Sequence, residues 1–140
     1  MEVTEALDFV RARNHGVLTT IRANGRPQLS NILYVPGDGD TFRISITDSR
    51  AKTVNMRRDP RISLYVPGDN FFQYVVLEGT AELSPVAADP HDDTVEQLIA
   101  YYRAGNGEHP DWDDYRAAMV ADGRLICAVR AERAYGMVGD

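Results

Sequence analysis

The most basic stretch of this chain runs from Ser49 to Arg61 and contains its only lysine, Lys52. The stretch holds five basic residues and one acid, whereas the whole chain carries a net charge of −6. A concentrated positive patch on an acidic protein is typical of a site for a specific anion. The patch follows a predicted strand and opens a predicted helix, a position that favours phosphate binding. The alternative is a solvated helix face that carries basic residues for solubility.

Arg50 and Lys52 can act on one ligand only under a geometric condition. They are two residues apart, so on a regular helix they would not share a face. They converge only if Arg50 lies in a turn that leads into the helix. The guanidinium, the ammonium and the backbone N–H groups at the helix start could then bind one phosphate together. Arg57 and Arg58 follow further along the helix and fit surface or ion-pairing roles equally well.

Gln28, Ser30 and Asn31 form a second polar group on a predicted strand. Short donors and acceptors of this kind suit the edge of a planar heterocycle or its polyol chain. The alternative is that every second residue of a half-exposed strand is polar for solubility. Composition by itself favours that alternative.

The aromatic residues Phe71, Phe72 and Tyr74 stand close together in the sequence. They could form an aromatic wall beside a bound ring. Phe and Tyr on strands are, however, more often part of the core.

The usual catalytic arrangements are absent from the sequence. His15, His91 and His109 are scattered without metal-ligand spacing, so no metal site is predicted. Cys127 lies in an apolar run and is expected to be a small buried hydrophobic residue. A phosphate-binding patch with few acid–base residues fits an enzyme whose cofactor carries the chemistry.

Size and composition limit the class of protein. The 140 residues predict a single domain, residues 1–140, and the 44% hydrophobic and 26% charged fractions are those of a globular protein. No apolar run or leader pattern predicts a membrane span or a signal peptide. The single cysteine fits a reducing cytoplasm, and the pI near 5.0 argues against nucleic acid as a partner.

Hydrophobic periodicity predicts the elements that must position these residues. Asn24-Gly25 between two β-rich runs predicts a hairpin, and the hairpin-rich order predicts a mostly antiparallel sheet closed into a barrel. Thr4 is the expected cap of the first helix, and Asp48 or Ser49 that of the second. Strands are predicted over 16–21, 27–35, 41–47, 61–66, 71–83 (bent at Gly79) and 124–129, and helices over 5–13, 49–58, 94–104 and 112–121.

Several sequence blocks, taken in order, resemble the split β-barrel flavin and deazaflavin oxidoreductases. The blocks are Gly16–Thr20, Gly25–Asn31, Arg50–Arg61, Val76–Ala81 and Asp111–Arg116. The chain is most similar to the actinobacterial group that uses coenzyme F420, which is described as pyridoxamine 5'-phosphate oxidase-like. The resemblance implies a mainly β protein with peripheral helices, an FMN-binding-like split barrel of mostly antiparallel Greek-key topology.

The resemblance also implies a homodimer with the cofactor sites at the subunit interface. Arg50 and Lys52 would hold the cofactor phosphate, and Ala51 would offer a backbone contact. Phe72 and Tyr74 would reach the ring or the substrate pocket from the partner subunit. The residues that would line the deazaflavin and its ribityl chain are Gln28, Ser30, Asn31, Ser45 and Asn55.

The implied activity is an F420-dependent reductase. It would transfer a hydride from the reduced deazaflavin to an electron-poor small molecule such as an enone, a quinone or a tetrapyrrole. Tyr74 or water would supply the proton. Two alternatives stay open: the same fold holding FMN as a pyridoxamine-phosphate-oxidase-like enzyme, and a non-catalytic carrier of F420.

Overall fold

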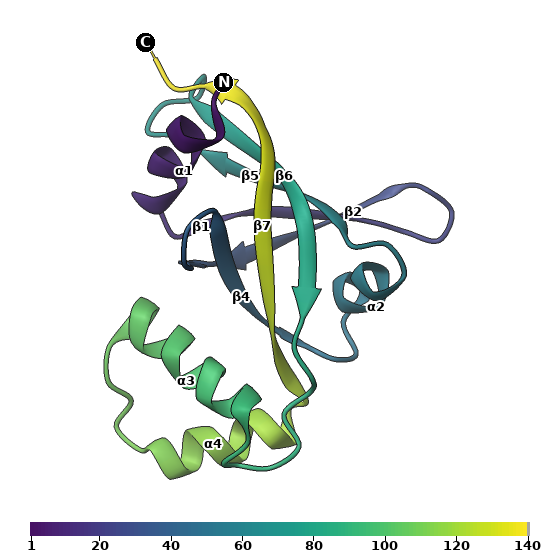
Figure 1. Ribbon diagram of the computed structural model, residues 1–140, viewed down its shortest axis with the longest axis vertical. Coiled ribbons are helices and arrows are strands. Elements are labelled where there is room, and N and C mark those ends of the chain that lie inside the picture. Colours follow the sequence, from purple (N-terminus) through teal and green to yellow (C-terminus); the bar gives the residue numbers. More distant parts are fainter. Residues whose placement is uncertain (140) are drawn as a thin grey trace.

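The computed structural model describes residues 1–139 as a strongly curled β-sheet with helices around it (Figure 1). The strands are β1 (His15–Ile21), β2 (Pro27–Leu33), β3 (Val35–Pro36), β4 (Thr41–Thr47), β5 (Arg61–Pro67), β6 (Tyr74–Leu83) and β7 (Arg124–Met137). The helices are α1 (Val3–Arg11), α2 (Ala51–Arg58), α3 (Asp93–Asn106) and α4 (Trp112–Ala121). The predicted mainly β fold with peripheral helices is confirmed.

The sheet has two free edges, so the barrel is split. Its seven strands run in the order β2-β1-β5-β6-β7-β4-β3, and each paired neighbour is antiparallel. β3 pairs with β4 only through Val35–Arg43 and Pro36–Phe42. Within residues 1–139, the half of β4 that leads to Thr47 therefore pairs with β7 on one side and with no strand on the other. This open half of β4 is where a ligand can approach the sheet edge.

Alternating side chains build the core of the barrel. In β4, Phe42, Ile44 and Ile46 are each 1% exposed, whereas Ser45 and Thr47 between and after them are half-buried. A period of two is what a strand requires when one face packs inside. The outward residues of β4 are thereby aimed away from the core, and their polar groups remain available.

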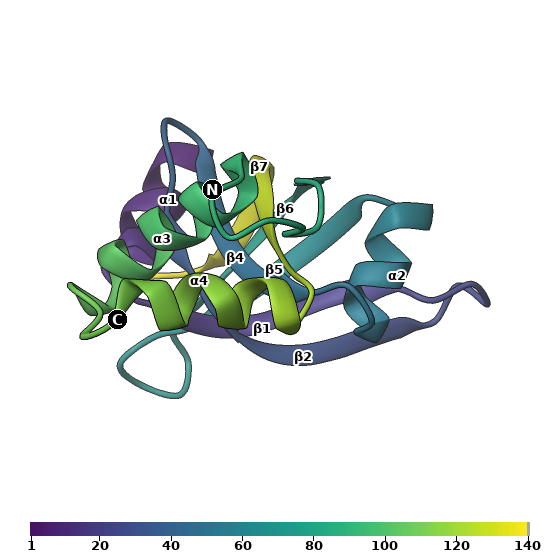
Figure 2. The same ribbon diagram turned by 90° about the horizontal axis from the view of Figure 1, so that it is seen from below.

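Helix α1 packs onto this core, and α3 and α4 form a separate one. Leu7 and Val10 of α1 belong to the barrel cluster, and the Tyr34 hydroxyl donates to the Val10 carbonyl at 2.6 Å. Leu98 of α3 and Tyr115 of α4 pack with Ile126 of β7 in a second cluster. Figures 1 and 2 show α3 and α4 lying side by side, and Figure 1 shows the pair below the sheet, away from α1. Among residues 1–139, no helix is long and apolar enough to cross a membrane.

The predicted caps of the first two helices are wrong. Glu2, not Thr4, precedes α1, and Arg50, not Asp48 or Ser49, precedes α2; neither makes a side-chain cap. The chain leaves β4 through a turn in which the Asp48 N–H donates to the Gly123 carbonyl at 2.9 Å. That turn delays the start of α2 and moves Arg50 to its N-terminus.

The strand predicted over 27–35 is divided in the structure, since β2 ends at Leu33 and Val35 begins β3. Two other predicted strand boundaries are also wrong. The strand predicted over 71–83 begins only at Tyr74, because Gly68 and Gln73 close a turn through a 2.8 Å backbone hydrogen bond. The strand predicted over 124–129 continues to Met137, where it pairs with Tyr74. The expected irregularity at Gly79 is present as a shift of register after Glu78. A side chain at Gly79 would collide with the Arg130 carbonyl, so the close approach of β7 requires glycine.

Candidate anion-binding site

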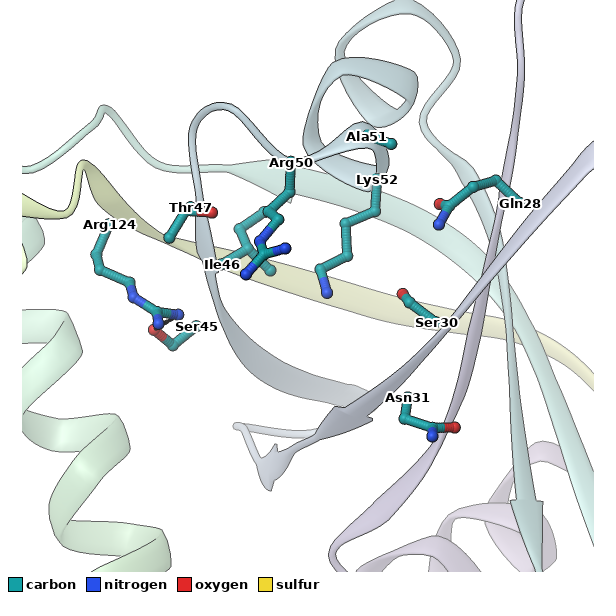
Figure 3. A pocket seen from close by; sticks show the side chains of 10 residues that line it. All are labelled: Gln28, Ser30, Asn31, Ser45, Ile46, Thr47, Arg50, Ala51, Lys52 and Arg124. Atoms are coloured by element: carbon teal, nitrogen blue, oxygen red, sulfur yellow. Dashed lines mark hydrogen bonds between the residues drawn. The ribbon is translucent and has the colours of Figure 1, made fainter.

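A pocket of about 430 Å³ opens in the split of the barrel, between β2, β4 and the start of α2 (Figure 3). It is where the free half of β4 comes opposite the edge strand β2. Elements far apart in the sequence meet here. Its lining residues are Gln28, Ser30 and Asn31 of β2, Ser45, Ile46 and Thr47 of β4, Arg50, Ala51 and Lys52 at α2, and Arg124 of β7.

The pocket is cationic and contains no acid. Arg50, Lys52 and Arg124 line it, and no lining residue is Asp or Glu. Among residues 1–139, none of the three forms an ion pair with a carboxylate. Burial, together with the positive charges of Arg50 and Arg124, lowers the pKa of Lys52 from its usual 10.5. An anion bound among these groups would offset both their mutual repulsion and the cost of their partial desolvation.

The N-terminus of α2 adds uncapped backbone donors to this pocket. Arg50 is extended (φ −68°, ψ 148°), so its side chain and that of Lys52 line the same pocket and the geometric condition is met. No side chain caps the helix and no acid lies in its first turn. The first N–H groups of a helix have no partner within it, and its dipole attracts negative charge. Basic residues at this end are unfavourable for an isolated helix and favourable for one that binds an anion.

Two unpartnered polar atoms lie on opposite walls of the pocket. Within the described part of the chain, the buried side-chain nitrogen and oxygen atoms without a hydrogen-bond partner are Ser30 Oγ and Arg124 Nε. Leaving a buried polar group unsatisfied costs about 1–3 kcal/mol. Both atoms belong to residues that line this one pocket, so the unmet hydrogen-bonding capacity of the buried side chains gathers at its walls.

Gln28 is partly held by the protein itself. Its Oε1 accepts a hydrogen bond from Thr20 Oγ1 at 2.9 Å, and its Nε2 lies 3.3 Å from the Leu29 carbonyl. This network fixes the orientation of the amide at the rim of the pocket. Asn31 is exposed and makes no such contact among the described residues.

Asn55 does not line the pocket. It is 7% exposed, its Nδ2 donates to Thr20 Oγ1 at 3.1 Å, and its Oδ1 accepts from Arg58 at 3.1 Å. The face of α2 that carries Asn55 packs against β1, because the helix lies over that strand. A contact of Asn55 with a ligand in this pocket would have to be indirect, through Thr20 and Gln28.

Phe72 and Tyr74 lie away from the pocket of their own chain. Phe71 and Phe72 are 90% and 72% exposed in the turn before β6 and meet edge to face. Tyr74 stacks on Tyr65, with ring centroids 5.6 Å apart. None of these rings is in the core, which excludes the core alternative for Phe71 and Phe72.

Arg124, Ile46 and Thr47 line the pocket but are not among the predicted site residues. Thr47 could have been suspected, since it directly precedes the turn that carries Arg50. Arg124 follows Gly123 and opens an apolar run, which is an ordinary start for a strand. It enters the pocket only because it pairs with Thr47 across β4 and β7. That pairing is non-local and leaves no local signal.

Comparison with known proteins identifies the relatives of this fold. The family model described as pyridoxamine 5'-phosphate oxidase matches residues 3–137. A solved structure described as an F420 reductase is 25% identical, with 91% of this chain and 94% of that chain covered and a TM-score of 0.64. The conserved hypothetical protein Rv2991 from Mycobacterium tuberculosis is 25% identical, with 100% and 93% covered and a TM-score of 0.71. HutZ, the heme storage protein from Vibrio cholerae, shares the fold at 16% identity, 97% and 95% coverage and a TM-score of 0.68.

The lining residues can bind and orient a ligand, but they offer little acid–base chemistry. None of them is His, Cys, Tyr, Asp or Glu. Arginine, lysine and hydroxyl groups can hold phosphate and polyol oxygens. Any redox chemistry at this site must therefore come from a bound cofactor.

Proposed function

The chain belongs to the pyridoxamine 5'-phosphate oxidase family, and from this premise we propose that it is an oxidoreductase that uses coenzyme F420. The proposed reaction is transfer of a hydride from the reduced deazaflavin to an electron-poor small molecule, such as an enone, a quinone or a tetrapyrrole. The observation that carries the proposal is the pocket in which Arg50, Lys52 and Arg124 converge without an acid. The likeness to an F420 reductase at 25% identity supports the choice of cofactor.

The residues of the pocket fit a phosphorylated deazaflavin. The Arg50 guanidinium, the Lys52 ammonium and the N–H groups at the start of α2 would hold the phosphate. Ser30, which lines the pocket, would turn its hydroxyl toward a ribityl hydroxyl. Gln28 and Asn31 on the edge strand would bond the polar edge of the ring.

The protein's contribution to the reaction is binding and orientation. The bound deazaflavin supplies the hydride. Anchoring the phosphate fixes the position of the ring relative to the substrate, which lowers the entropic part of the barrier. Backbone N–H groups near the ring would stabilise negative charge on its reduced form. The proton comes from Tyr74 of a second copy or from water.

A homodimer is part of this proposal. Leu29, Tyr65 and Tyr135 are 60%, 39% and 51% exposed and line one hollow on the outer face of the sheet. Exposed apolar groups gathered in this way are typical of an interface. Leu33 and Tyr65 line a second hollow beside the first. Pairing two copies over this face would cover these groups and would bring the exposed Phe72 of one copy to the ligand of the other.

A fluorescence titration with F420 and, at the same salt concentration, with FMN tests the cofactor. We expect micromolar or tighter binding of F420 and weaker binding of FMN. A preference for FMN would move the protein to the flavin enzymes, and no binding of either would contradict the proposal. Tight F420 binding without turnover over a panel of enones, quinones and tetrapyrroles would instead favour the carrier. Sedimentation equilibrium tests the dimer, and a monomer at the enzyme concentrations of the titration would contradict that part.

A further inference from the structure

Arg124 occupies its own end of the pocket. Figure 3 shows its side chain beside Ser45, on the far side of Arg50 and Lys52 from Gln28. The backbone of Arg124 is fixed on two sides, since it pairs with Thr47 of β4 and its carbonyl accepts from the Ala87 N–H at 2.8 Å. The side chain of Arg124 therefore projects from a fixed point of the sheet and not from a flexible loop.

The guanidinium of Arg124 is only weakly bonded within the protein. One terminal nitrogen lies 3.5 Å from Ser45 Oγ, the limit of a hydrogen bond, and the buried Nε has no acceptor in the part of the chain that the structure describes. The phenols that face it, Tyr101 and Tyr115, are no counterions. Burial raises the pKa of both hydroxyls, that of Tyr115 to about 12, so both are neutral at physiological pH. Arg124 thus has an unmet demand for an anionic acceptor.

The charge of the pocket exceeds what one phosphate supplies. A phosphodiester carries a single negative charge, and the Arg50–Lys52 pair with the start of α2 is sufficient to bind it. The third positive charge, on Arg124, would then remain partly desolvated and without a counterion, which is costly. A ligand with a second acidic group removes that cost.

We propose that Arg124 and Ser45 form a second anionic subsite, which binds an acidic group on the tail of the ligand beyond its ring-proximal phosphate. The inference rests on the proposed function in that the pocket is taken to hold a phosphorylated cofactor. The chemistry recognised is an oxygen anion that accepts from the guanidinium fork and from the serine hydroxyl. Two sources offer it: the carboxylates of the glutamyl tail of F420, and the second phosphate of FAD.

Two matched ligand pairs distinguish these sources. F420 is compared with the 5'-phosphate of the same deazaflavin, which lacks the tail, and FAD is compared with FMN. Fluorescence titrations measure the affinity of the purified wild-type protein for all four ligands. We expect at least one of the two tailed ligands, F420 or FAD, to bind more tightly than its untailed partner. A preference in the first pair identifies the carboxylates, and one in the second pair identifies the phosphate.

Arg124→Gln is the variant that tests the residue. Because a hydrogen bond to a charged group is lost, its affinity for the tailed ligand should fall by about 10- to 100-fold while that for the untailed ligand changes by less than about threefold. Arg130→Gln is the matched control, since Arg130 lies exposed on the same strand outside the pocket and the change in net charge is identical. It should leave both affinities as in the wild type. Arg124→Lys keeps the positive charge but loses the paired N–H donors of the guanidinium. It is the second variant to use if Arg124→Gln does not fold.

The outcomes separate this inference from the proposed function. An equal loss of affinity for both members of a pair in Arg124→Gln would show a general electrostatic effect and overturn the subsite. Equal wild-type affinity for tailed and untailed ligands would overturn it as well and leave the cofactor proposal intact. No binding of any of the four ligands would overturn both.

Discussion

Both ends of helix α2 carry basic residues, but among the residues that the structure describes their side chains have partners only at the C-terminal end. At the N-terminus, Arg50 and Lys52 line a pocket, and neither pairs with a carboxylate of residues 1–139. At the C-terminus, Arg57 pairs with Asp48, and Arg58 donates to the Ile21 carbonyl at 2.6 Å and to Asn55. All four belong to one basic stretch of the sequence. The composition of the stretch cannot distinguish the two pairs. Their hydrogen bonds and ion pairs in the folded protein do.

The difference indicates which charges stabilise the fold and which await a ligand. The Arg58 contacts join α2 to β1, so the helix is fixed through its C-terminal end. The N-terminal end gains nothing from its cations in the free protein, because they repel one another; burial and this repulsion together lower the pKa of Lys52. The same contrast holds between the pocket and the α3–α4 pair, where Trp112 donates to Glu108 at 3.0 Å and Tyr115 to the Leu98 carbonyl at 2.9 Å. Satisfied polar groups of that kind are structural.

The largest effect that tests this comparison is expected from Lys52→Ala. Loss of a charge-assisted hydrogen bond to phosphate should weaken F420 binding by about 10- to 100-fold. The midpoint temperature of thermal unfolding should change little or rise slightly, because the repulsion of Lys52 by Arg50 and Arg124 is removed. The measurements are a fluorescence titration and a thermal melt of the same sample. Unchanged affinity would sink the assignment of this end of the helix to phosphate.

The second prediction compares a buried asparagine that supports the fold with an exposed asparagine at the pocket. Asn55→Ala should lower the free energy of unfolding by about 1–3 kcal/mol, since Thr20 and Arg58 lose a buried partner. Asn31→Ala, at the exposed rim of the pocket, should leave stability within about 0.5 kcal/mol and weaken ligand binding instead. Urea unfolding and the same titration measure both. If Asn55→Ala keeps full stability but loses affinity, the ligand contact implied by the family resemblance is right and the structural role is wrong.

A smaller effect is expected in the pH dependence of binding. Lys52 binds phosphate as a cation, and its pKa in the free protein is lowered from 10.5, so affinity should fall as pH rises and begin to fall below that value. In Lys52→Arg the charge persists, and affinity should stay level between about pH 7 and pH 10. The sign for stability is opposite: the unfolded chain binds the extra proton between the two pKa values, so the free wild-type protein gains stability with pH there. Identical pH profiles for the two proteins would contradict the role of Lys52.

The smallest effect is expected from Arg57→Ala. Its ion pair with Asp48 is half-exposed on both sides, and such pairs contribute about 0–1 kcal/mol. Both the unfolding free energy and the F420 affinity should lie close to the wild-type values. This variant removes the same charge as Lys52→Ala from the same helix. A large loss of affinity here would mean that net charge, rather than placement, governs binding.

The sequence located most of the pocket because its signals are local. Arg50 and Lys52 stand between a strand and a helix, and the alternating polar residues of β2 are visible in the chain itself. Of the predicted residues, Gln28, Ser30, Asn31, Ser45, Arg50, Ala51 and Lys52 come together in one pocket. Asn55 lies outside this pocket, and the sequence could not show this, because the rotation of α2 against β1 decides whether its face meets the pocket or the sheet.

What the sequence determined by itself is the set of elements and their inward faces, since apolar periodicity follows directly from strand and helix geometry. It also fixed the position of the cationic patch and the absence of acid–base residues around it. Only the tertiary structure decided that the sheet stays split between β2 and β3, and that Arg124 meets Ser45 from 79 positions away. Both depend on which strands pair across long separations, and such pairing is set by the packing of the whole barrel rather than by any local pattern.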